Sequence, residues 1–114
     1  MSLIRIQNYI DGFLVDPQSN AWLDNFEPAT GTVFSRVPDS NQDDIHRAVL
    51  AAKGAVETWS TVTADERAAA LNRIADLIDQ NREELVEMES KDNGKTRNLA
   101  RAVDIPRCSK NLRF

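Results

Sequence analysis

The stretch that decides the fold runs from Thr63 to Lys95 and reads "TADERAAALNRIADLIDQNREELVEMESKDNGK". Thr63 and Glu66 have the spacing of a capping box, in which two side chains at the start of a helix bond each other's backbone N–H groups. Apolar residues then recur every three or four positions, which is the period of one helix face. We expect that face to point inward, and it contains Leu71, Ile74, Ala75 and Ile78, with Leu77 beside them.

The same stretch contains its own helix breaks. Asn81 indicates a restart of the helix after the first apolar face. Gly94 predicts the end of the second helix, because glycine readily takes the left-handed conformation that follows a last helical turn. A final apolar segment holds Pro106, which has no backbone N–H, so the helix there should bend or restart.

A further helix is expected before this stretch. Residues 38–41 read "PDSN", which breaks a strand and offers side chains that cap a helix start. One apolar stripe follows at helical spacing, and it contains Ile45, Ala48, Val49, Ala52, Val56 and Trp59.

The amino-terminal part reads as strands. Asp11-Gly12 separates two short apolar runs, and Asp-Gly between such runs is a strong signal of a β-hairpin. A second hairpin is predicted where "AWLDNFEP" and "TVFSRV" flank the tight turn "EPATG". The fold class is therefore α+β, with a β-hairpin region at residues 1–37 and three to four helices in a helical region at residues 38–114.

Composition limits the function classes. The chain has 114 residues and a net charge of −4, so it forms at most one domain and lacks the basic surface that nucleic-acid binding requires. No apolar run approaches the ~20 residues of a membrane span, and we expect neither membrane nor nucleic acid as a partner. The start resembles no signal peptide, and the single cysteine suits the reducing cytoplasm, where we place the protein.

Residues that could carry chemistry are sparse. The stretch "NGKT" resembles the end of a phosphate loop, but Glu89 stands where that loop requires glycine. His46 falls on the polar face of its helix, and Cys108 has no second histidine to activate it. We therefore expect no catalytic residue and no cofactor-binding residue in this chain.

Several motifs in order nevertheless resemble one family. "NYIDG", "NFEPATGTVFSRVP", "IHRAVLAAKGAVETWST", "ESKDNGKT" and "NLRF" are similar to the N-terminal part of NAD(P)-dependent aldehyde dehydrogenases, from about Asn8 to Phe114. "EPATG" matches the family's N-P-A-T-G with Glu27 in place of asparagine, and "ESKDNGKT" matches E-x-x-D-x-G-K. The stretch "LARAVDIPR" is most similar to the branch that acts on 2-aminomuconic or 2-hydroxymuconic semialdehyde.

The resemblance implies that this chain is an incomplete N-terminal part of a larger enzyme. In that family these segments belong to the cofactor-binding domain of an α/β, Rossmann-like fold. The parent would oxidise a small aldehyde to a carboxylic acid with NAD(P). Its glycine-rich cofactor turn, general base and nucleophilic cysteine lie further along the chain, and Cys108 is not that cysteine. The 114 residues alone should therefore be inactive and bind no NAD(P).

The resemblance also implies a monovalent cation. Some family members bind one through backbone near "NFEP" and through the aspartate of "DNGK", which corresponds here to Asn25, Phe26 and Asp92. The alternative is that Asp92 is only a helix-end aspartate in a turn with Asn93-Gly94.

A second function stays open beside the first. The chain could be a self-sufficient helical interaction or regulatory module without catalysis. If the chain is instead part of a larger enzyme, we expect a homo-oligomer, because Leu112, Phe114 and the hairpin edge would lean on a missing part of the parent and leave adhesive surface in water.

Overall fold

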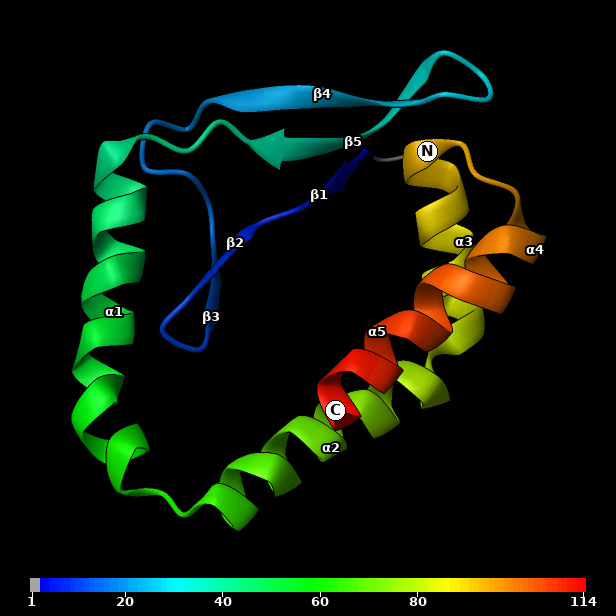
Figure 1. Ribbon diagram of the computed structural model, residues 1–114. Coiled ribbons are helices and arrows are strands. Elements are labelled where there is room, and N and C mark those ends of the chain that lie inside the picture. The colour runs from blue at the N-terminus through cyan, green and yellow to red at the C-terminus, as the bar shows by residue number, and fades with distance from the viewer. Residues whose placement is uncertain (1–2) are drawn as a thin grey trace. The chain divides into compact units, whose positions relative to one another are not determined.

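The computed structural model describes residues 3–114, with strands in the first third of the chain and helices after them (Figure 1). The α+β prediction is therefore confirmed. The described residues form two compact units. The first comprises residues 3–26 and 31–61, and the second comprises residues 27–30 and 62–114. The first helix thus packs with the strands, although the sequence placed it in a separate helical region.

Three strands form one sheet in the order β1-β5-β4. They are β1 (Ile4–Arg5), β4 (Trp22–Glu27) and β5 (Thr32–Pro38). The hairpin of β4 and β5 was predicted, whereas β1 was not. β1 runs parallel to β5, with Ile4 opposite Ser35. This third strand supplies the support without which a two-stranded ribbon is marginal in water.

The predicted Asp11-Gly12 hairpin is also present. It joins β2 (Asn8–Ile10) and β3 (Phe13–Val15) as an antiparallel pair, with Ile10 opposite Phe13. Asp11 and Gly12 have φ angles of 54° and 83°. Two consecutive positive φ values match the twist of the flanking strands, which explains why this dipeptide closes the hairpin.

The first helix, α1 (Gln42–Thr61), begins where the cap residues predicted it. The Asn41 side chain accepts the backbone N–H groups of Asp43 and Asp44 at 3.0 and 3.1 Å. The helix contacts β2 of the hairpin. Most of its apolar stripe is nevertheless exposed; the exposed fractions are 61% for Ile45, 45% for Val49, 60% for Val56 and 49% for Trp59.

The second unit contains the remaining helices. They are α2 (Ala64–Gln80), α3 (Arg82–Asn93), α4 (Arg97–Leu99), the π-helical turn η1 (Ala100–Asp104) and α5 (Ile105–Arg113). The capping box of Thr63 and Glu66 is formed. Gly94 ends α3 with a left-handed φ of 77°, and Pro106 lies in the first turn of the restarted helix α5. These three local predictions are confirmed.

The core of the second unit is small. Val86, Ala100 and Ile105 are buried together, with Ile78 and Leu85 packed against them. The predicted inward face of α2 is correct for Ala75, which is fully buried, but wrong for Leu71 and Ile74, which are 41% and 48% exposed. The reason is length: α5 has nine residues and α2 has seventeen, so α5 covers only part of that face.

Candidate functional site

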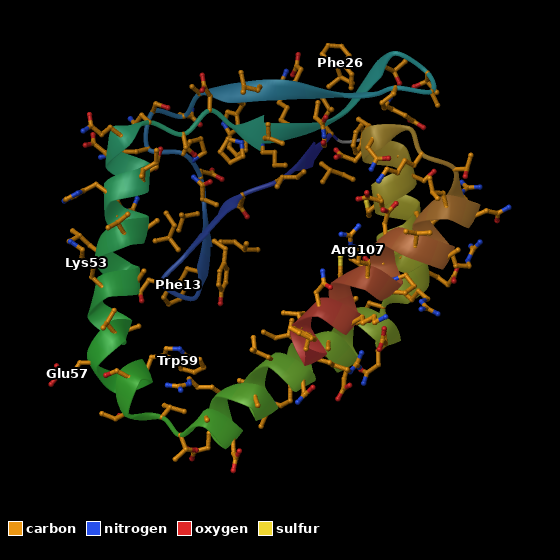
Figure 2. The ribbon with its side chains drawn as sticks, viewed as in Figure 1. Phe13, Phe26, Lys53, Glu57, Trp59 and Arg107 are labelled. Carbon is orange, nitrogen blue, oxygen red and sulfur yellow. The ribbon has the colours of Figure 1, made fainter. Side chains whose placement is uncertain are left out.

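Two of the three predicted cation-site residues lie on β4. The side-chain amide nitrogen of Asn25 donates to the hydroxyl of Ser35 at 3.1 Å, and Ser35 is fully buried in β5. Phe26 is 54% exposed and projects from the strand (Figure 2). The sheet therefore fixes the backbone at Asn25 and Phe26, which the family resemblance implicates in binding the cation.

The third residue, Asp92, is exposed and is the second-last residue of α3. A carboxylate at this end faces the negative pole of the helix dipole, which favours a positive charge nearby. Asn25 and Phe26 belong to the first compact unit and Asp92 to the second, so the three-residue cation site stays a prediction. Within residues 3–114 no group of three or more His, Cys, Asp or Glu side chains is arranged to hold a metal ion.

The second unit contains a cleft of about 490 Å³ that sequence reasoning missed. The turn after β4 forms one side of it, and the end of α3 with the loop that follows forms the other. Its lining residues are Glu27, Ala29, Glu87, Met88, Ser90, Lys91, Gly94, Lys95 and Arg97. The two family motifs "EPATG" and "DNGKT" therefore meet at this cleft, and their distance in the sequence hid the connection.

Ion pairs hold two of the basic side chains that line this cleft, Lys95 and Arg97. The Arg97 Nε lies 2.8 Å from Glu87 Oε1, and the Lys95 Nζ lies 3.1 Å from Asp104 Oδ2. The hydrogen bond to Asp104, with the nearby charges of Asp104 and Glu89, raises the pKa of Lys95. Carboxylates therefore already hold Lys95 and Arg97, which both line this cleft.

Short contacts fix the loop that follows α3. The Ser90 hydroxyl donates to the Lys95 carbonyl oxygen at 2.6 Å, and the Lys95 N–H donates to Asn93 Oδ1 at 2.9 Å. A Cβ atom added at Gly94 would lie 3.0 Å from the Cβ of Pro28. Glycine is thus required here both by the backbone conformation and by the close approach of the "EPATG" turn.

Neither Cys108 nor His46 is among the residues that line this cleft. Cys108 is exposed on α5, and His46 is exposed on α1. The predicted absence of catalytic and cofactor-binding residues stays a prediction. Among residues 3–114, no helix has the length and apolar character that crossing a membrane requires.

Comparison with known proteins places these motifs in a family. Residues 14–114 match the aldehyde dehydrogenase family. The human 2-aminomuconic semialdehyde dehydrogenase is 45% identical over 113 residues, which are 99% of this chain and 23% of that protein. The Danio rerio protein of the same name is 46% identical over 114 residues, which are 100% of this chain and 23% of that protein.

Solved structures agree. The NAD⁺ complex of an aldehyde dehydrogenase from Bacillus cereus is 36% identical with a TM-score of 0.92, over 96% of this chain and 23% of that one. An NAD-dependent aldehyde dehydrogenase from Sinorhizobium meliloti is 32% identical with a TM-score of 0.91, over 98% of this chain and 23% of that one.

The chain belongs to the aldehyde dehydrogenase family. It spans about 23% of the length of the 2-aminomuconic semialdehyde dehydrogenases from Homo sapiens, Mus musculus and Danio rerio that it matches. The predicted resemblance, including its branch, is therefore confirmed.

Proposed function

We propose that this chain forms the amino-terminal part of an NAD(P)-dependent enzyme that oxidises a muconic semialdehyde to the carboxylic acid. The observation that carries this proposal is the 45% identity to a 2-aminomuconic semialdehyde dehydrogenase over 99% of the chain. The reaction consumes the aldehyde, water and the oxidised nicotinamide cofactor, and it releases the acid, a proton and the reduced cofactor.

The chain's own contribution to this reaction is structural. A bound nicotinamide cofactor supplies the hydride acceptor in such an enzyme. The residues described here bring the "EPATG" turn against the end of α3, where Gly94 leaves room for Pro28. We expect this rigid junction to hold neighbouring parts of the enzyme in position rather than to exchange protons with substrate.

A segment replacement tests the proposal. Residues 14–114 of this chain would replace the matching segment of the human 2-aminomuconic semialdehyde dehydrogenase, and formation of reduced NAD would be followed with 2-aminomuconic semialdehyde. We expect a soluble enzyme that retains activity within about tenfold of its parent, a change of roughly 1.4 kcal/mol in the activation barrier. A second chimera carries the same replacement together with Gly94→Ala. We expect this chimera to lose activity, because the added Cβ would strain the junction with Pro28.

Two outcomes would contradict the proposal. A folded chimera without activity would show that the segment does not serve this enzyme. Reduction of NAD by the purified 114-residue chain alone would show that the chain carries its own catalytic residues. The alternative of a self-sufficient interaction or regulatory module gains support if the chain binds the intact human enzyme and changes its rate without replacing any segment.

We further propose that the whole enzyme binds a monovalent cation near Asn25, Phe26 and Asp92. The position of Asp92 in the last turn of α3 supports this proposal, because the negative end of the helix dipole favours a positive charge nearby. Thermal unfolding of the chimera in potassium chloride and in tetramethylammonium chloride tests it. We expect potassium to raise the melting temperature, and we expect Asp92→Asn, but not Asp43→Asn, to remove the difference.

We also propose that the protein works in the cytoplasm, because a single cysteine suits a reducing compartment. We propose in addition that it assembles into a homo-oligomer, because many large apolar side chains are exposed.

A further inference from the structure

Asn93-Gly94 is the one Asn-Gly pair in the sequence. In such a pair the backbone nitrogen of the glycine can attack the side-chain amide carbon of the asparagine, because no Cβ hinders its approach. A bond forms between that nitrogen and Cγ, and the bond from Cγ to Nδ2 breaks. The proton lost by the glycine nitrogen passes to the Nδ2 amino group, which leaves as ammonia. Water then opens the resulting ring to aspartate or to isoaspartate.

At the end of α3, hydrogen bonds hold the backbone nitrogen of Gly94 and both polar atoms of the Asn93 side-chain amide. The Gly94 N–H donates to the Ser90 carbonyl oxygen at 3.0 Å, so this nitrogen is occupied as the last bond of the helix. The Asn93 Nδ2 donates to Glu89 Oε1 at 2.5 Å, and the Asn93 Oδ1 accepts the Lys95 N–H at 2.9 Å.

These contacts oppose attack, although the site is exposed to water. Asn93 and Gly94 are both exposed, so solvent can reach the pair. The nitrogen must nevertheless leave Ser90 before it can lose its proton and attack, and the amide group must leave Glu89 before it can rotate. Opening of the last helical turn is therefore a required first step.

We propose that Asn93 is a deamidation site whose reaction is gated by opening of the α3 end. Deamidation is irreversible, and it occurs only when the helix end opens far enough for the glycine nitrogen to reach the asparagine side chain. It requires only water, and neither an enzyme nor an oxidant takes part.

The product would disturb the junction described above. A carboxylate at position 93 places a second negative charge against Glu89, which now accepts a hydrogen bond from the amide. Isoaspartate also inserts one extra methylene group into the main chain, directly before Gly94. Because Gly94 lies close to Pro28, the lengthened chain would separate the end of α3 from the "EPATG" turn.

Incubation of the purified protein at mildly alkaline pH, with and without urea, tests this proposal. Mass spectrometry of proteolytic peptides would follow conversion at Asn93, with Asn81-Arg82 and Asn98-Leu99 as internal controls that have bulky following residues. We expect conversion at Asn93 alone, slower by about tenfold or more without urea, because local opening must come first. Glu89→Ala should speed the reaction in the folded protein and leave the rate in urea unchanged, whereas Glu84→Ala should alter neither.

Several results would overturn the gating proposal. One is an equal rate at Asn93 with and without urea while circular dichroism shows a folded protein. Another is conversion of Asn81 or Asn98 as fast as Asn93. A third is a Glu89→Ala variant that reacts at the rate of the unmodified protein in the folded state, because the amide contact would then have no effect.

Discussion

Asn41 and Asp44 cap each other at the start of α1. The Asp44 backbone N–H donates to Asn41 Oδ1 at 3.1 Å, and the Asn41 backbone N–H donates to Asp44 Oδ2 at 3.1 Å. The other Asp44 oxygen accepts the Gln18 backbone N–H at 3.0 Å, and Asp44 is only 2% exposed. One carboxylate thus joins the helix start to the loop between β3 and β4.

Replacing Asp44 should lower the free energy of unfolding by more than replacing an exposed aspartate would. In Asp44→Ala the backbone N–H groups of Asn41 and Gln18 lose their acceptor, so the free energy of unfolding should fall by about 2 kcal/mol or more. Urea unfolding measures it. Asp43→Ala is the matched control, because it removes an equal charge from the same turn but leaves the cap intact. Equal losses in the two variants would show that helix-dipole charge, rather than capping, explains the role of Asp44.

The second capping box makes α2 sensitive to acid. The hydrogen bond from the Thr63 hydroxyl, and then that from its backbone N–H, lower the pKa of Glu66 below its usual 4.5. The stabilisation that ionised Glu66 gives to α2 is therefore fully present above the pKa of Glu66 in the unfolded chain. It disappears as pH falls through the lower pKa of Glu66 in the folded protein. Far-UV circular dichroism should show α2 losing helix over that acid range.

Glu66→Gln separates protonation from loss of the bond. Glutamine keeps an oxygen that can accept from Thr63 but cannot titrate, so the acid sensitivity of α2 should shrink while its helix content near neutral pH changes little. Asp65→Asn, in the same turn, serves as the control. If Asp65→Asn flattened the acid transition as much as Glu66→Gln, general charge would explain the effect better than the capping box.

Local signals in the sequence predicted the element boundaries because the interactions that set them are themselves local. Thr63 and Glu66 lie within one helical turn, Asp11-Gly12 closes its own hairpin, and Gly94 ends α3 through its own φ angle. Each of these needs only neighbouring residues, so the residue types are sufficient to identify it.

Features that join distant segments were not predictable in this way. The pairing of β1 with β5 depends on Ile4 meeting Ser35, and neither stretch is distinctive alone. The burial of Asp44 depends on the loop at Gln18, and the position of Asp44 in a first helical turn does not indicate that contact. Periodicity identified the apolar face of α2, but it could not show that a short α5 leaves Leu71 exposed.

The candidate site could likewise be predicted only in part from the sequence. Asn25, Phe26 and Asp92 came from family motifs, and their residue types alone would not have indicated a cation. The cleft beside Lys95 arises because the turn at residues 27–30 packs against the end of α3, a contact between segments far apart in the sequence.

The hairpin and the chain end should make the protein self-associate. Tyr9, Phe13 and Leu14 are 73%, 69% and 65% exposed, and Phe114 is fully exposed. Each large apolar side chain left in water forgoes about 1.5–3 kcal/mol of burial, which favours association. Sedimentation velocity at micromolar concentration should show an oligomer.

Charged substitutions should weaken that assembly. We expect Phe13→Asp and Phe114→Asp each to weaken association by about tenfold or more, since loss of one buried aromatic exceeds 1.4 kcal/mol. Gln42→Asp adds the same charge at an exposed helix start and should leave association unchanged. A monomeric native protein, or equal weakening by all three variants, would contradict this prediction.

Two glycine substitutions should change stability in opposite directions. Gly94 has a φ of 77°, and an added Cβ would lie 3.0 Å from the Cβ of Pro28. Gly94→Ala should therefore cost about 1–2 kcal/mol for the left-handed conformation alone, with the crowding at Pro28 added to it. Gly54 lies inside α1 with no atom within 4 Å of an added Cβ, so Gly54→Ala should stabilise α1 by about 0.5–1 kcal/mol. Hydrogen exchange resolved by peptide would measure both effects where they occur, at the end of α3 and along α1. Unchanged protection at the end of α3 in Gly94→Ala would mean that the αL cap and its contact with Pro28 do not hold that turn closed.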